Sequence, residues 1–574
     1  MNLNKIIDVA MGRKKADLVL KGASVLNVFT EQLEHKDVAI CDGYIAGLGR
    51  YEGKEEVDVS GKIIVPGFMD GHMHLESTLL TPAQFERCSL PRGTTAVMAD
   101  PHEIANVAGT RGIDYIMKLA KPLDMHIYFN LPSCVPASPL EESGAVLEAE
   151  DLKPYYQHKK VLGLAEVMNS VGVTEGDEKL LQKLSDAESF DGIIDGHAPF
   201  LGGKDLNAYT AAGIRSDHEC TNAQEAIEKI AVGQWIMIRE GTAAKNLDAL
   251  LPICKPPYCY RAMFCTDDRH PEDLLREGHM DAIIRKAVDK GVHPAHAVRM
   301  CTLNPAEYFG LKGYGAVAPG YHADLLVLSD FIDFSVEQTY IDGKLVAEKG
   351  MVIHDHAADP PDDEKILRSF HMAPVTPDIL RFKEIKERQR VIGLKKRELL
   401  TDEIIIQPTD HGRENNGIDI ERDILKAAVF ERHHNTGHIG IGFINGYGLK
   451  RGAIATSVAH DSHNLIAVGC SDEDIAAAAE QVRRMNGGFA VVENGEVIES
   501  LSLPIAGLMS PLTAQEADER LNRLKKAARR LGVSDDIDPF MTLGFVSLPV
   551  IPILRLNGKG LINVTKQEIV EATF

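Results

Sequence analysis

The sequence predicts an α/β protein built around a TIM-like (β/α)8 barrel, and three observations support this prediction. Apolar segments of strand length recur eight times between residues 62 and 268. Segments of helical length separate them, which is typical of parallel strands joined by crossover helices. Eight such units within about 250 residues match the size of a TIM barrel, and several of them end in polar side chains, where barrel active sites are built.

Short strands and turns precede the barrel, as the alternating apolar pattern of the first 65 residues indicates. A similar run returns downstream, where "ADLLVL" at 323–328 resembles "ADLVL" at 16–20. We therefore expect the two ends of the central domain to pair into one small, discontinuous β-sandwich. Its expected limits are residues 1–64 and 319–353, and the barrel would then occupy residues 65–318.

The eight segments expected to form the barrel strands share an apolar body and a polar end. They cover residues 62–74, 94–102, 125–133, 161–168, 193–199, 213–219, 234–240 and 262–268. The helices between them are less sharply defined by the sequence. The stretch 270–291, after the last strand, is strongly amphipathic and predicts one long helix.

Beyond the sandwich, the chain is expected to form a linker and a second domain. Residues 354–400 begin with the charged, proline-containing run "HDHAADPPDDEK" and continue as a basic helical stretch through Lys396. Between residues 401 and 574, strand-like segments are combined with helical ones around 473–486 and 513–531. This pattern predicts a C-terminal α+β domain.

Charge and cysteine content argue against several classes of function. With 62 basic and 84 acidic residues among 574, the chain has a formal charge of −22, which repels nucleic-acid backbones and anionic membranes. Nine scattered cysteines without a CxxC pair indicate reduced thiols, not a disulfide framework or a structural zinc site. The N-terminus lacks a cleavable signal pattern and no apolar run approaches the roughly 20 residues of a membrane span, so we expect a cytoplasmic protein.

Two histidines stand one residue apart in "GFMDGHMHLES", after the apolar run "KIIV". Residues two apart on a strand point to the same face, so His72 and His74 can bind one object. Polar residues also end four further predicted strands. Together the strand ends offer His72, His74, Glu166, His197, His218 and Asp267.

This set of four imidazoles and two carboxylates predicts a metal centre. Each histidine taken alone is more often a packed or surface residue, and a lone glutamate is more often ion-paired, but the joint pattern at five strand ends favours metal binding. Nitrogen and carboxylate donors without thiolates suit borderline divalent ions such as manganese, iron or zinc. Two ions bridged by a carboxylate and a hydroxide would use all six residues.

The segments "VPGFMDGHMH", "DGHA", "SDHE" and "FCTDD" resemble the amidohydrolase superfamily of metal-dependent hydrolases. More closely, "DPHEIANVAG", "GLAEVM", "REGTAAKNL" and the C-terminal "AHDSHNLIAVG" resemble the adenine deaminase family, over nearly the whole chain. The resemblance implies hydrolysis of a C–N bond in a cyclic amidine, which converts adenine and water to hypoxanthine and ammonia in purine salvage. It also implies two divalent ions, manganese before iron or zinc, with Glu166 bridging them where many amidohydrolases use a carbamylated lysine.

The resemblance also suggests roles in catalysis. We expect a hydroxide that bridges the two ions to attack C6 of adenine. Asp267 would take the hydroxide proton and pass it toward the departing amino group, a general acid–base role. Glu219, immediately after His218, is a second catalytic candidate, for protonating a ring nitrogen. We expect a homo-oligomer, a dimer or larger, with adenine as its small-molecule partner.

Six further residues are candidates for binding the purine: Asp100, His102, Glu103, Arg239, His460 and His463. Structural roles compete with this interpretation. Asp100 precedes a proline and could cap the helix that begins near Glu103, and Arg239 could pair with Glu240 to brace loops. The histidines of "AHDSHN" could hold a separate metal, close over the barrel mouth or form a subunit contact.

Two other functions stay open at this point. The same six ligands would serve another amidohydrolase, one that acts on a different amino-heterocycle or on a cyclic amide. A barrel without activity would serve only as a binding protein, although the intact ligand set argues against this. A substrate screen distinguishes the first alternative, and turnover by an Asp267→Asn variant addresses the second.

Overall fold

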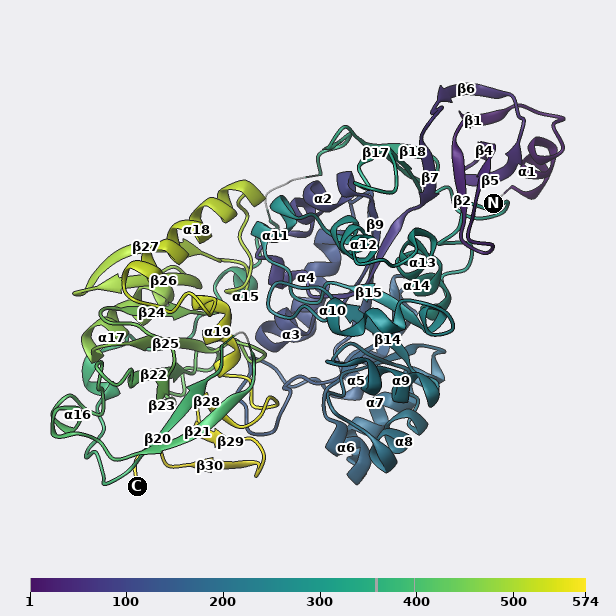
Figure 1. Ribbon diagram of the computed structural model, residues 1–574. Coiled ribbons are helices and arrows are strands. Elements are labelled where there is room, and N and C mark those ends of the chain that lie inside the picture. The colour runs from purple at the N-terminus through teal and green to yellow at the C-terminus, as the bar shows by residue number, and fades with distance from the viewer. Residues whose placement is uncertain (1, 357–359, 397) are drawn as a thin grey trace.

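The computed structural model describes residues 2–356, 360–396 and 398–574. At its centre, eight parallel strands in two sheets, of five and three strands, form a barrel that helices surround (Figure 1). They are β8 (Phe68–Met73), β9 (Thr94–Ala99), β10 (His126–Leu131), β11 (Val161–Val167), β12 (Ile193–Gly196), β13 (Ser216–Asp217), β14 (Trp235–Arg239) and β15 (Ala262–Cys265). Each falls within one of the predicted segments. β8 to β12 pair in sequence order, β13 to β15 do the same, and a parallel bridge between Met73 and Asp267 joins the last strand to the first.

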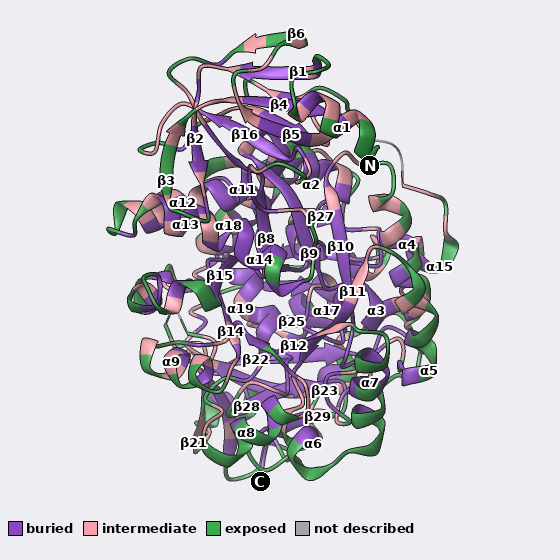
Figure 2. Cartoon of the chain, turned by 90° about the vertical axis from the view of Figure 1, so that its right-hand side faces the viewer, coloured by how far each residue is buried: buried purple, intermediate pink, exposed green. Residues whose placement is uncertain are grey.

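The barrel strands are apolar on both faces because both faces are covered. In β14, Ile236 and Ile238 pack outward with Ile283 and Ile284 of the surrounding helices, whereas Met237 points into the barrel and joins Met263. Figure 2 shows the buried strands flanked by helices whose outer surfaces are exposed. Around the barrel lie α2 (Pro82–Ser89), α4 (Thr110–Ala120), α7 (Glu178–Ser189), α8 (Gly203–Ala211), α9 (Ala223–Ala231), α12 (Met280–Asp289) and α13 (Pro294–Met300). The TIM-like barrel predicted from the sequence is therefore confirmed.

The prediction of one helix over residues 270–291 is wrong in one respect, because the structure has two helices there. α11 spans Pro271–Arg276 and α12 spans Met280–Asp289. Between them Gly278 has a φ of +117°, which side-chain-bearing residues rarely adopt. The apolar periodicity continues across the break, although Leu274 of α11 packs in one apolar cluster and Ile283 and Ile284 of α12 pack in another, and so the sequence pattern hides the interruption.

Two sheets at one end of the barrel form the expected sandwich. One has the order β5-β4-β1-β6 and the other the order β19-β18-β17-β16-β7-β2-β3. Their strands are β1 (Ala16–Lys21), β2 (Ser24–Asn27), β3 (Gln32–His35), β4 (Asp37–Cys41), β5 (Tyr44–Gly49), β6 (Gly53–Asp58), β7 (Ile63–Pro66), β16 (Leu325–Leu328), β17 (Val336–Ile341), β18 (Lys344–Glu348) and β19 (Met351–Val352). The two similar sequence runs form β1 and β16, which lie in different sheets and share one apolar core that includes Leu18, Leu20, Leu325 and Val327.

The C-terminal part is an α+β domain, as predicted, with an eight-stranded sheet covered on both faces (Figure 1). In sheet order its strands are β21 (Thr401–Ile406), β20 (Gln389–Leu394), β23 (Ile439–Asn445), β22 (Leu425–Phe430), β25 (Leu465–Gly469), β24 (Ala453–Thr456), β26 (Gly488–Glu493) and β27 (Glu496–Ser502). Ala428 packs toward α17 (Asp472–Arg484) on one face, and Val429 packs toward α18 (Ala514–Arg530) on the other. Both helices lie where the sequence predicts them.

The basic helical stretch predicted through Lys396 is not present. Within the described residues of 354–400, the only α-helix is the short α15 (Glu364–Leu367), and residues 389–394 form β20. Val391 and Ile392 are both buried because β20 lies inside the C-terminal sheet, between β21 and β23. A strand buried on both faces does not alternate, so its short apolar run resembles a helix segment in sequence.

Other expectations concern composition. The nine cysteines are free thiols and most of them are buried. In the part of the chain that the structure describes, no helix combines the length and the apolar character needed to cross a membrane. The domain limits at residues 64, 318, 353 and 400 stay predictions.

We expect Gly278→Ala to destabilise the protein by about 1 to 3 kcal/mol, because the backbone is strained for any residue with a Cβ. A Cβ at this position would also lie 2.4 Å from Oδ1 of Asp281, which accepts the hydrogen bond of the His279 amide. Thermal unfolding followed by circular dichroism measures the change. Gly202→Ala is the matched control, since its φ is −146° and no atom lies within 4 Å of the added Cβ. Equal melting temperatures for the two variants would contradict the prediction.

Candidate metal centre at the barrel mouth

The six predicted ligands come together at the C-terminal ends of the barrel strands. His72 lies in β8 and His74 directly follows it, while Glu166 lies near the end of β11. His197 follows β12, His218 follows β13 and Asp267 follows β15. All lie at one end of the barrel because its strands run parallel and therefore end on the same side.

Glu166 lies between two pairs of histidines. Its Oε1 is 3.4 Å from Nε2 of His74 and 3.8 Å from Nε2 of His72. Its Oε2 is 2.7 Å from Nδ1 of His197 and 3.2 Å from Nε2 of His218. One carboxylate thus presents one oxygen to each pair, which is the arrangement that a bridging ligand of two cations needs.

Asp267 completes the side of the cluster that contains His72 and His74. Its Oδ1 is 3.1 Å from Nε2 of His74 and 3.6 Å from Nε2 of His72. Its Oδ2 accepts a hydrogen bond of 2.7 Å from Nη1 of Arg239. The φ of Asp267 is +60°, a conformation that costs free energy for a residue other than glycine and that often occurs at functional sites.

The electrostatics of the cluster suit a cation. Burial alone would raise the pKa of Glu166, but the imidazoles of His218, His197 and His74 hold it well below its usual range. Burial likewise opposes ionisation of Asp267, and the Arg239 guanidinium with the neighbouring histidines holds its pKa well below the ordinary value. Two buried carboxylates are therefore anionic, and they require positive charge close by.

The histidines are oriented so that a lone pair can face the cluster. Nδ1 of His74 lies 3.1 Å from the carbonyl oxygen of Asp100, which can only accept, so Nδ1 carries the hydrogen and Nε2 is free to bind. Nε2 of His72 is buried and has no hydrogen-bond partner among the described residues. An unpaired buried nitrogen is unfavourable in a protein interior unless a ligand satisfies it. The donor set therefore fits a divalent metal centre.

Arg239 connects this centre to Glu219. Its Nη2 donates to Oε2 of Glu219 at 3.1 Å, and its Nη1 contacts both Glu219 and Asp267. Glu240 faces elsewhere, because its carboxylate accepts hydrogen bonds from the Leu247 amide and from Lys286. The alternative in which Arg239 pairs with Glu240 is therefore wrong, and the partner is Glu219.

The cluster is open on the side of His197 and Glu219. The side chain of His197 is 18% exposed and that of Glu219 is 15% exposed, whereas those of His72 and His218 are 2% exposed. A small molecule can therefore approach the centre along this side. The opposite side is closed by the turn at Asp100 and by the C-terminal domain.

The remaining purine-binding candidates form a second buried cluster beside the first. Asp100 accepts hydrogen bonds from the His102 amide and from its Nδ1, at 3.0 and 2.8 Å. The carboxylate of Glu103 contacts Nδ1 of His460 at 2.7 Å and Nε2 of His463. The C-terminal histidines therefore close over the barrel mouth, which was one of the three expected arrangements. Asp100 contacts the first turn of α3 (His102–Ala108) through the His102 amide, but the N-cap residue is Pro101 and no side chain caps the helix, so the alternative role of Asp100 as a helix cap is wrong.

Two acidic residues that the sequence did not single out belong to this cluster. Oδ1 of Asp461 is 3.9 Å from Nε2 of His102, and its Oδ2 has no hydrogen-bond partner among the described residues. Glu141 is buried nearby with neither carboxylate oxygen paired in the described part of the chain. Burial, with the negative charge of neighbouring acids, raises the pKa of Asp461 to about 6 and that of Glu141 well above its ordinary value. Asp461 could have been noticed between the two histidines of "AHDSHN", but Glu141 has no comparable signal.

Comparison with known proteins gives a consistent result along the whole chain. Residues 63–346 match the amidohydrolase family, and residues 398–568 match the adenine deaminase C-terminal domain. The chain is 47% identical to adenine deaminase 2 of Carboxydothermus hydrogenoformans, with 100% of both chains covered. It is 45% identical to the adenine deaminase of Desulfatibacillum aliphaticivorans and 44% identical to that of Bacillus pumilus, with 98% and 97% of each chain covered.

The pairing of His460 with Glu103 predicts a pH-dependent contribution to stability. Burial lowers the pKa of His460, but the charge and hydrogen bond of Glu103 outweigh this effect and raise it from 6.5 to about 9. A raised folded-state pKa stabilises the fold fully below the unfolded value, and this stabilisation is lost as the pH rises through about 9. The shift corresponds to at most about 3 kcal/mol.

We therefore expect His460→Gln to be destabilising near pH 6 and to approach the wild type near pH 9.5, because only the wild type loses this contribution over that window. Urea unfolding of the metal-loaded protein at several pH values measures the difference. His411→Gln, at an exposed histidine of the same domain, is the matched control. A difference between His460→Gln and wild type that stays constant with pH would contradict the assignment.

Proposed function

The chain belongs to the adenine deaminase family, and on that basis we propose that its barrel hydrolyses adenine to hypoxanthine and ammonia at a centre of two divalent ions. The observation that carries this proposal is the position of Glu166. One carboxylate oxygen faces His72 and His74, and the other faces His197 and His218. This geometry provides for two cations at a short separation, as binuclear hydrolases require.

Each ion would have its own donors. His72, His74 and Asp267 with Oε1 of Glu166 would hold one, and His197 and His218 with Oε2 of Glu166 would hold the other. When bound, such ions lower the pKa of a water molecule and so supply hydroxide near neutral pH. Manganese is the ion that we propose, since a set of nitrogen and carboxylate donors without thiolates suits it, and iron and zinc are the alternatives.

Asp267 is the residue that we assign to proton transfer. Oδ1 points toward the histidine pair, and Oδ2 is fixed by Arg239. An anionic carboxylate held in this way can accept a proton from water and then release it to the amino group that leaves as ammonia. Glu219 accepts a hydrogen bond from Nη2 of Arg239, so it helps to position Asp267 through that arginine. Because Glu219 lies on the open side of the cluster, its carboxylate could also contact a ring nitrogen of the substrate.

Recognition of the purine would fall to the second cluster. Nε2 of His102 is 3.7 Å from Glu103 and 3.9 Å from Asp461, so it has no short hydrogen bond and is available to a ligand. The unpaired oxygen of Asp461 is available in the same way. We propose that ring nitrogens of adenine contact these two groups. His460 and His463, which hold Glu103, would close the site and exclude water.

The first test is direct assay of the reaction. Protein prepared with and without manganese is given adenine, and ammonia release and the absorbance change to hypoxanthine are followed, with adenosine and cytosine as control substrates. We expect turnover of adenine alone, and only in the metal-loaded protein. Binding of about two ions without adenine turnover would keep the metal centre and reject the substrate.

We expect Asp267→Asn to lower kcat by about 10² to 10⁴-fold, the usual contribution of general acid–base catalysis. Elemental analysis of the same preparation separates loss of proton transfer from loss of metal. Asp205→Asn, at an exposed position of α8, is the matched control and should keep wild-type turnover. Full activity of Asp267→Asn with its metal in place would exclude the proposed role.

A further inference from the structure

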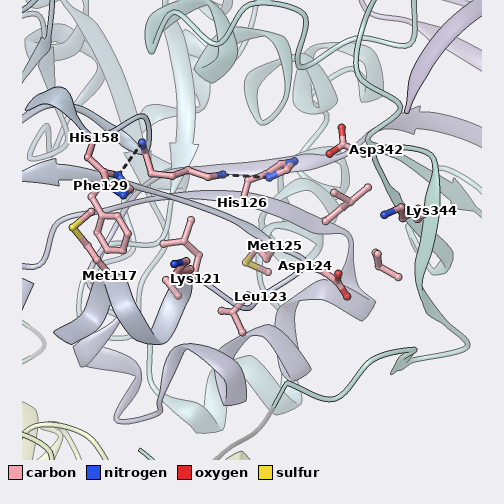
Figure 3. A pocket seen from close by; sticks show the side chains of 15 residues that line it. Met117, Lys121, Leu123, Asp124, Met125, His126, Phe129, His158, Asp342 and Lys344 are labelled. Atoms are coloured by element: carbon pink, nitrogen blue, oxygen red, sulfur yellow. Dashed lines mark hydrogen bonds between the residues drawn. The ribbon is translucent and has the colours of Figure 1, made fainter. Parts of the chain in front are cut away.

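A second pair of histidines one residue apart lies far from the barrel mouth. His354 and His356 follow β19, where the chain leaves the sandwich, and they approach Asp124 between α4 and β10. Figure 3 shows Asp124 on this segment, beside a cavity of about 510 Å³. Because Asp124 precedes β10, it lies at the N-terminal end of the barrel, opposite the cluster around Glu166.

The side chains of this segment alternate in direction. Nδ1 of His354 is 3.2 Å and Nε2 of His356 is 3.1 Å from the same oxygen, Oδ2 of Asp124. Asp355, between them, contacts Nη1 of Arg87 in α2 at 3.4 Å. The two imidazoles therefore face one carboxylate, while the side chain of Asp355 pairs with Arg87.

The three donors match the chemistry and the spacing of a metal site. Two imidazoles and one carboxylate are ligands for borderline divalent ions, and donors held about 2.0 to 2.2 Å from one tetrahedral ion lie about 3.3 to 3.6 Å apart. The two distances to Asp124 need to open only slightly to reach this range. The side chain of His354 is 60% exposed and those of Asp124 and His356 are 27% and 23% exposed, so water can complete the coordination.

We propose that Asp124, His354 and His356 form a mononuclear site for a borderline divalent cation of the zinc type, separate from the barrel centre. Two neutral imidazoles that donate to Asp124 would give the same distances without an ion, and the experiment must therefore separate these states. The proposal does not depend on the deaminase reaction.

The position of the site indicates what a bound ion would do. Farther along the chain, Asp363 accepts two hydrogen bonds of 2.9 Å from Arg111, and the hydroxyl of Tyr115 donates to the Pro361 carbonyl at 3.2 Å. Arg111 and Tyr115 lie on α4, whereas Asp124 lies beyond its C-terminal end. An ion at Asp124 would therefore fasten the connection to the C-terminal domain at one end of α4, and the Arg111 pair fastens it at the other. Because the ion binds only the folded arrangement, it would raise stability in proportion to its affinity.

The test counts ions in the full-length protein. Chelator-treated protein is equilibrated with zinc chloride, dialysed and analysed for total metal per chain, and its melting temperature is recorded with and without zinc. We expect Asp124→Asn to bind one ion fewer per chain than wild type, because asparagine can still accept hydrogen bonds from both histidines but is a much weaker metal ligand. We expect the double variant His354→Ala with His356→Ala to show the same loss.

His158→Ala is the control, because this exposed histidine lines the neighbouring cavity without approaching Asp124. It should bind as much zinc as wild type. Equal zinc content and equal zinc-dependent melting shifts in wild type, Asp124→Asn and the double variant would overturn the proposal. If the barrel does not bind two ions, the zinc content of wild type and of all three variants would fall by the same amount. This outcome therefore cannot be mistaken for loss of the site at Asp124.

Discussion

The fold is organised around the placement of one buried carboxylate, Glu166. Its oxygens must face histidines that come from β8 on one side and from the ends of β12 and β13 on the other, although more than 100 residues separate the first pair from the second. A closed parallel barrel meets this demand because every strand ends on the same side. Burying an anion without a cation costs several kcal/mol, so the arrangement that makes the centre costly for the apoprotein also makes it receptive to divalent ions.

The C-terminal domain contributes to the same site through Glu103. This barrel residue contacts His460 and His463, and the loop between them carries Asp461 toward His102. The loop joins β24 and β25, which lie inside a sheet that is packed on both faces. A domain that appears separate in sequence is therefore part of the wall that excludes solvent from the centre.

The sequence predicted the features that depend on the periodicity and the order of apolar segments. It missed those that depend on contacts between segments far apart in the chain. The barrel strands and the candidate ligands at their ends follow from apolar runs that end in polar residues, as at His72 and Glu166. The choice of Glu219 over Glu240 as the partner of Arg239 depends on how the strand ends are rotated, which no local pattern records. The break at Gly278 and the strand β20 were missed because apolar periodicity reports burial and not backbone conformation.

The two His-x-His pairs show that such a motif acquires its function from its surroundings. In both pairs, the two imidazoles approach the same carboxylate oxygen. His72 and His74 are buried and face two carboxylates, so an ion held there would lie in a medium of low dielectric. His354 and His356 share one carboxylate at the surface, where bulk water would screen a bound ion and complete its coordination. The buried pair would therefore suit chemistry, and the exposed pair would suit a link between two parts of the chain.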